Sequence, residues 1–154
     1  MRKHKFLTLM LAAVLAISLM VSIASAQTPY ESMLTEVLEQ LKADTPWGIV
    51  DVVGAFDLWI AEAAFFLDVR SSEDYEAGHI PGATLVPLET LPGNLDKLPQ
   101  DKDALILVYC KTGWTASLGM MTLRLFGYVN VKGFSGSWLA WTEADHPITE
   151  GTAP

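Results

Sequence analysis

The chain has 154 residues, of which 51% are hydrophobic and 18% are charged, with 10 Lys and Arg against 18 Asp and Glu and a single cysteine. This length fits one domain with a real core, and the apolar content excludes intrinsic disorder. A lone cysteine excludes an internal disulfide and a structural zinc site, so we expect neither a metal nor another cofactor. The formal charge of −8 argues against nucleic-acid binding, which needs clustered Lys and Arg.

The first 26 residues have the pattern of an export signal. Three basic residues lie among the first five, an almost wholly apolar stretch follows over residues 6–23, and Ala24-Ser25-Ala26 is a small-x-small cleavage motif. We therefore predict a signal peptide over residues 1–26, a periplasmic or extracellular destination, and no membrane span after cleavage. An uncleaved membrane anchor is the less favoured alternative, because about 18 apolar residues is the lower limit for crossing a bilayer. Cleavage leaves 7 basic against 18 acidic residues, a net charge of −11.

Residues 27–45 are predicted to form an amphipathic helix and a linker. Thr28 is placed as an N-cap, with proline at the first helical position and Glu31 three residues after the cap. Apolar residues then recur at helical spacing, which predicts a helix over residues 29–42. This helix either covers the core of the domain or contacts a partner.

Short apolar runs alternate with helix-like stretches over residues 46–148, and residues 149–154 are left as a C-terminal tail. The runs predict strands at 49–53, 65–69, 105–109 and 129–132, and helices at about 55–63, 72–77, 88–96 and 116–126. This order predicts an α/β fold of three layers, in which helices cover both faces of a mainly parallel, five-stranded sheet. Ligands bind such sheets at the carboxyl ends of the strands.

Cys110 directly follows the predicted strand at 105–109 and precedes a loop that leads into a helix. A thiolate in such a loop receives backbone N–H groups and the positive end of the helix dipole, and both favour its charged form. Gly113 allows successive N–H groups to point inward, as in an anion-binding nest. We therefore take Cys110 as the candidate nucleophile, with a buried, inert thiol as the alternative. The candidate binding loop consists of Lys111, Thr112, Gly113, Trp114 and Thr115.

Two groups of residues resemble the signatures of rhodanese-like domains. They are Leu67-Asp68-Val69-Arg70 with Gly78-His79-Ile80-Pro81-Gly82-Ala83, and Val108-Tyr109-Cys110 and Gly113 with Gly136 and Trp141. The resemblance covers residues 46–146 and implies an exported, single-domain sulfurtransferase without a cofactor. In such an enzyme Cys110 takes a sulfane sulfur from a donor, holds it as a persulfide and passes it to a thiol acceptor. The implied partners are that donor and that acceptor, with a partner protein as a further candidate. The chain is expected to be a monomer.

Thr115 departs from the pattern of the family. Active rhodanese loops usually carry arginine at this fifth position after the cysteine, where a guanidinium binds an oxyanion such as thiosulfate. Lys111 is the loop's only cation, and it either replaces the arginine in part or is solvated. We therefore expect thiosulfate to be a weak donor. Ala116 stands where related phosphatases with a longer loop carry their arginine, so protein phosphatase activity is not expected.

The sequence leaves the roles of several residues open. Asp68 and Arg70, at the end of a predicted strand, either support the loop or form a structural pair. Trp114 walls off the sulfur site, contacts a partner or simply packs against the domain. His79 looks structural within its motif. Because the loop arginine is missing, two further functions are retained: a non-catalytic binding or regulatory module, and a redox-sensing thiol protein whose disulfide forms with another molecule.

Overall fold

The computed structural model of the protein describes residues 28–43 and 48–152. The predicted signal peptide over residues 1–26 and the linker at 44–45 lie outside the described residues. Within the described ranges, no helix combines the length and the apolar character needed to cross a membrane. The chain divides into two compact units, residues 1–35 and 36–154, and α2 (Pro29–Ala43) runs across the boundary between them.

The start of α2 has the capping geometry that the sequence predicts. The N–H of Thr28 donates to Glu31 Oε2 at 2.8 Å, and the N–H of Glu31 donates to Thr28 Oγ1 at 3.2 Å. This reciprocal pair satisfies N–H groups that have no partner within the helix. The predicted helix over residues 29–42 is thereby confirmed to within one residue.

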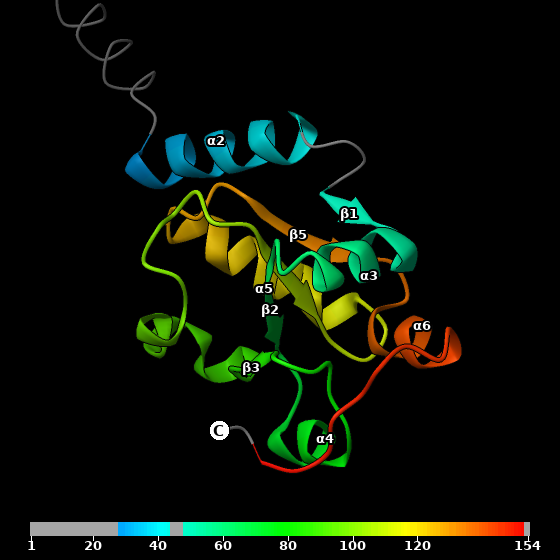
Figure 1. The fold of residues 1–154 in the computed structure, drawn as a ribbon. Coiled ribbons are helices and arrows are strands. Elements are labelled where there is room, and N and C mark those ends of the chain that lie inside the picture. The colour runs from blue at the N-terminus through cyan, green and yellow to red at the C-terminus, as the bar shows by residue number, and fades with distance from the viewer. Residues whose placement is uncertain (1–27, 44–47, 153–154) are drawn as a thin grey trace, which may run out of the picture. The chain divides into compact units, whose positions relative to one another are not determined.

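Five parallel strands form the sheet, in the order β1-β5-β4-β2-β3 (Figure 1). They are β1 (Ile49–Val50), β2 (Phe65–Asp68), β3 (Thr84–Leu85), β4 (Ile106–Tyr109) and β5 (Val131–Phe134). The central strand β4 is buried at all four positions, as expected for a continuous apolar run inside a parallel sheet. The predicted fold class is therefore confirmed.

Helices lie on both faces of this sheet (Figure 1). They are α3 (Val52–Ile60), α4 (Ser72–Ala77), α5 (Trp114–Leu125) and α6 (Ser137–Glu143), with two 3-10 segments, η1 (Leu88–Gly93) and η2 (Leu95–Lys97). Side chains alternate along β4, so that Val108 packs in a core cluster with Leu123 of α5, and Leu107 packs in a second cluster with Trp141 of α6. The sheet therefore separates two apolar cores.

The predicted strand over residues 49–53 is wrong at Val52 and Val53, which begin α3. Asp51 caps this helix, because its Oδ1 accepts the N–H of Gly54 at 2.8 Å. The cap outweighs the strand preference of two β-branched valines. For the same reason the helix predicted over residues 55–63 is displaced, since α3 begins and ends three residues earlier.

The predicted helix over residues 88–96 is also wrong in type. This stretch forms the two 3-10 segments η1 and η2 instead of one α-helix. Pro92 lies inside η1 and has no N–H to donate, so a regular α-helix cannot run through it. The sequence also did not locate β3, whose two residues are too few to show a period.

Candidate functional site

Cys110 lies directly after the central strand β4, at its carboxyl end. The alternation along the strand directs Ile106, Val108 and then Cys110 to the face covered by α5, where all three join one apolar cluster. The side chain of Cys110 is 3% exposed, and its Sγ accepts the N–H of Gly113 at 3.1 Å. The Gly113 N–H therefore donates a hydrogen bond to the sulfur from the other end of the turn.

The loop after Cys110 leads straight into α5, as the sequence predicts. Gly113 precedes the first residue of the helix with a φ of +108°, a conformation that favours glycine. The Gly113 carbonyl accepts the N–H of Ser117 at 3.0 Å and its hydroxyl at 2.9 Å. No side chain caps this end of α5, so N–H groups of its first turn have no side-chain partner at the loop.

The remaining loop side chains differ in exposure. Lys111 and Thr112 are exposed, and Trp114 is 77% exposed at the start of α5. Thr115, the second residue of α5, is half-buried and offers a hydroxyl where active members of the resembled family usually have arginine. Lys111 therefore supplies the positive side chain within the loop itself.

Two hollows flank this loop. One, of about 320 Å³, is lined by residues 112–114 of the loop and by Phe134 at the end of β5. The other, of about 160 Å³, is lined by Lys111 together with Arg70 and Trp138. Arg70 and Lys111 thus line one hollow, and Thr112, Gly113 and Trp114 line the other.

Asp68 and Arg70 form a buried ion pair. Arg70 Nη2 lies 2.6 Å from Asp68 Oδ2 and also donates to the carbonyl of Gly78 at 2.7 Å, and the guanidinium stands 4.5 Å from the ring centre of Trp138. Burial opposes the charge on Arg70, but the hydrogen bond and the negative charge of Asp68 outweigh it and raise the pKa of Arg70. The guanidinium is therefore committed to structural partners, as the structural-pair hypothesis expects.

The hydroxyl of Tyr109 belongs to the same buried network. It accepts the N–H of Ile80 at 3.2 Å. Burial, followed by the charge and the hydrogen bond of Asp68, raises the pKa of Tyr109 far above its ordinary value. Tyr109 thus remains a neutral phenol that ties β4 to the segment after α4.

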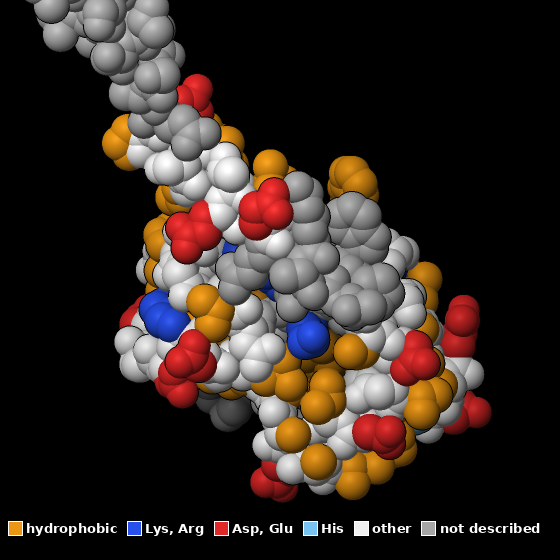
Figure 2. Space-filling model, turned by 90° about the horizontal axis from the view of Figure 1, so that it is seen from above, with side chains coloured by type: hydrophobic (Ala, Val, Ile, Leu, Met, Phe, Trp, Pro, Cys, Tyr) orange, Lys and Arg blue, Asp and Glu red, His pale blue; other side chains and the backbone are white. Residues whose placement is uncertain are grey.

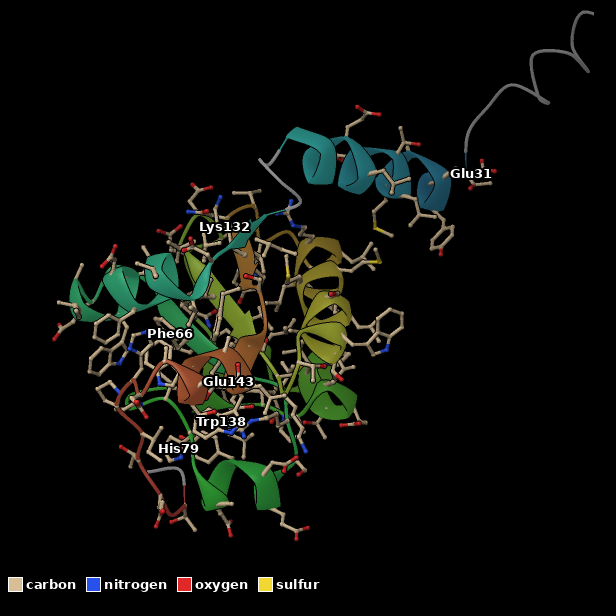
Figure 3. All side chains as sticks on the ribbon, turned by 90° about the vertical axis from the view of Figure 1, so that its right-hand side faces the viewer. Glu31, Phe66, His79, Lys132, Trp138 and Glu143 are labelled. Atoms are coloured by element: carbon tan, nitrogen blue, oxygen red, sulfur yellow. The ribbon has the colours of Figure 1, made fainter. Side chains whose placement is uncertain are left out.

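His79 has structural surroundings. Its ring is 4% exposed and stacks on Tyr75 with the ring centres 3.6 Å apart, and its Nδ1 lies 2.9 Å from the Tyr75 carbonyl oxygen. Figure 3 shows His79 below Trp138, which lies between α6 and α4. Among residues 28–43 and 48–152, no three His, Cys, Asp or Glu side chains gather in a way that could hold a metal ion.

The start of α6 contacts Cys110, which the sequence reasoning did not foresee. Ser137 Oγ accepts the N–H of Cys110 at 3.3 Å. The N–H of Trp138 donates to the Cys110 carbonyl at 3.0 Å, and the N–H of Leu139 donates to the Lys111 carbonyl at 3.1 Å. The available signal was a serine directly after Gly136, at a second turn from strand to helix. Its partner, however, lies 27 residues away along the chain.

Comparison with known proteins places these features in a family. Residues 34–144 match the family described as the rhodanese-like domain. The thiosulfate sulfurtransferase PspE of Escherichia coli K12 is 28% identical over 89 residues, which cover 58% of this chain and 86% of PspE. The tRNA uridine(34) hydroxylase of Erwinia tasmaniensis is 38% identical over 77 residues, or 47% of this chain, and the match spans 22% of that protein. A human single-domain sulfurtransferase has the same fold, with a TM-score of 0.58, 24% identity, and coverage of 62% of this chain and 96% of that one.

Proposed function

The chain belongs to the rhodanese-like domain family, and we propose that it is a sulfurtransferase or sulfur carrier that holds sulfane sulfur as a persulfide on Cys110. The observation that carries the proposal is the placement of Cys110 at the carboxyl end of the central strand, with the Gly113 N–H on its Sγ at 3.1 Å. Residues 46–148 are proposed as the sulfurtransferase domain. Export directed by residues 1–26 is part of the same proposal.

The proposed chemistry consists of two displacements at sulfur. The Cys110 thiolate attacks the outer sulfur of a persulfide or polysulfide donor, so that a bond to Cys110 Sγ forms, the donor S–S bond breaks, and the donor thiolate leaves with the electron pair. An acceptor thiolate then attacks the outer sulfur and releases the Cys110 thiolate. Each step exchanges one S–S bond for another, so no external oxidant or reductant is needed. The N–H groups at the loop stabilise the anionic sulfur in both steps.

The charges around the loop favour persulfide and polysulfide donors over thiosulfate. Transfer from thiosulfate expels sulfite, a dianion that requires a strong cationic clamp. Thr115 supplies none, and Arg70 is bound to Asp68 and to Gly78. The chain carries 18 Asp and Glu against 10 Lys and Arg, and Figure 2 shows acidic side chains spread over the face seen from above. Attraction of a small anion therefore depends on Lys111 and the loop N–H groups.

Loading of the unmodified protein tests this function. Incubation with polysulfide is expected to add about 32 Da per sulfane sulfur, and an added thiol is expected to remove that mass. Intact-mass spectrometry measures both steps, with protein alkylated beforehand by iodoacetamide as the control. Thiosulfate is expected to load the protein much more slowly. The absence of an adduct from every donor contradicts the proposal.

Thr115→Arg is expected to raise the rate of loading from thiosulfate roughly tenfold or more, because a charged hydrogen bond contributes about 1.5–3 kcal/mol. Loading from polysulfide is expected to change little, since its leaving thiolate does not need a guanidinium to bind it. Thr115→Gln is the matched control, as it adds length without charge. If thiosulfate loading is the same in Thr115→Arg as in the unmodified protein, the missing arginine is not what limits this donor.

A binding module is the second candidate function, and one surface feature favours it. Trp114, Leu118 and Met121 are exposed on successive turns of α5, beside the candidate loop. An exposed apolar strip of this kind is more typical of a contact surface than of a solvated helix face. The rate of Cys110 alkylation near neutral pH separates the two functions, since a module that only binds needs no reactive thiol. A reactive thiol that becomes oxidised but takes up no sulfur supports the redox-sensing alternative instead.

A further inference from the structure

Ser137 is a buried serine in a backbone conformation that serine rarely adopts. Its φ is +51°, and it follows Gly136 with a φ of +75°. Residues with a Cβ are strained in this left-handed region, whereas glycine is not. Ser137 is 0% exposed, and no side-chain cap holds the start of α6. A serine that keeps its side chain here must gain an interaction elsewhere that offsets the strain.

That interaction is with the backbone of the candidate nucleophile. Ser137 Oγ accepts the N–H of Cys110 at 3.3 Å. A Cβ built onto Gly113 would lie 3.9 Å from the same oxygen. The hydroxyl therefore lies close to both Cys110 and Gly113, the first and last residues of the turn. The next N–H along α6, that of Trp138, donates to the Cys110 carbonyl at 3.0 Å. Both backbone polar groups of Cys110 are thus held by the start of α6.

We propose that Ser137 is a positioning residue for Cys110, which keeps the sulfur on the Gly113 N–H during sulfur transfer. This inference rests on the proposed use of Cys110 as the sulfur carrier. The hydroxyl fixes the backbone of Cys110 just after β4, and so sets the position from which Sγ reaches the Gly113 N–H at 3.1 Å.

A purely structural role for Ser137 makes a different prediction. If the serine only fills space at the start of α6, glycine is an equal or better residue, because it relieves the strain at a φ of +51°. Ser137→Gly and Ser137→Ala both remove the hydroxyl, but only the alanine variant keeps the strain. Stability should therefore distinguish the two variants, whereas a positioning role affects the thiol of both in the same way.

The test compares the pH dependence of alkylation by iodoacetamide, which reports on Cys110 alone because the chain has one cysteine. In both variants the pH midpoint of alkylation is expected to rise, by at most roughly one unit, because Sγ is held less firmly on the Gly113 N–H and one hydrogen bond to the thiolate is weakened. Loading by polysulfide is expected to slow about tenfold. Ser137→Gly should unfold at the same urea concentration as the unmodified protein or a higher one, and Ser137→Ala at a lower one.

Ser72→Ala is the matched control, since Ser72 is an exposed serine at the first position of α4, as Ser137 is at the first position of α6. It should leave the alkylation profile unchanged. An unchanged alkylation profile in Ser137→Gly overturns the positioning role, even if Ser137→Ala fails to fold. Alkylation proceeds whether or not sulfur is transferred, so failure of the proposed function appears separately, as an unmodified protein that alkylates normally but takes up no sulfur.

Discussion

Cys110→Ser is expected to take up no sulfur from any donor. A serine hydroxyl forms no S–S bond, and the chain has no second cysteine that could replace Cys110. The unmodified protein should gain about 32 Da per sulfane sulfur after incubation with polysulfide, whereas the mass of the variant should stay constant. Intact-mass spectrometry measures the difference directly, and it is the largest effect that we expect of any single substitution.

Cys110→Ala serves as the matched control for Cys110→Ser. Both variants lack the sulfur, but alanine places no hydroxyl among the apolar neighbours of residue 110. Circular dichroism should show that both variants keep the fold, so that a lost adduct reports on chemistry. A sulfur adduct on either variant at the level of the unmodified protein contradicts the assignment of Cys110 as the sulfur carrier.

Arg70→Met is expected to destabilise the protein by about 3–5 kcal/mol, because it leaves the Asp68 carboxylate buried without its ion-pair partner. Asp68 is 0% exposed, and it accepts hydrogen bonds from the N–H, Nε and Nη2 of Arg70. The substitution also removes the hydrogen bond to the Gly78 carbonyl. Urea unfolding followed by tryptophan fluorescence measures the loss of free energy of unfolding.

The double variant Asp68→Asn with Arg70→Met is expected to recover part of this loss, since it removes both charges together. Lys97→Met is the control for the change from a cation to methionine, and at this exposed position it should change stability by less than about 0.5 kcal/mol. If Arg70→Met costs less than about 1 kcal/mol, the pair behaves like an exposed ion pair and the structural account of Arg70 is wrong.

The central elements of the fold could be predicted because their signals are local. The buried strand β4 is a continuous apolar run, and the α4 helix begins and ends at the residues that the sequence predicts. Where a strand signal and a helix signal fall on the same residues, the prediction from the sequence is wrong. Val52 and Val53 favour a strand by their branched side chains, but the Asp51 cap makes them the first turn of α3.

The candidate site could be predicted in part, for a similar reason. The strand, the loop and the helix around Cys110 are contiguous in the chain, so the position of the thiol at the end of β4 follows from order alone. The contact between Ser137 and Cys110 joins two segments 27 residues apart, and no period or motif reveals such a hydrogen bond. The same limit applies to the bond from Arg70 to the Gly78 carbonyl, whereas the pairing of Arg70 with Asp68, two residues away, is one of the two alternatives that the sequence leaves open.

The two outermost strands of the sheet, β1 and β3, are each only two residues long. Unpaired N–H and C=O groups at the rim of a sheet are the usual template on which a second chain adds a strand, and their number grows with strand length. Within the described part of the chain, these rims therefore offer little backbone for amyloid-like growth or strand exchange. The three four-residue strands β2, β4 and β5 lie in the interior of the sheet, where their backbone groups are paired on both sides.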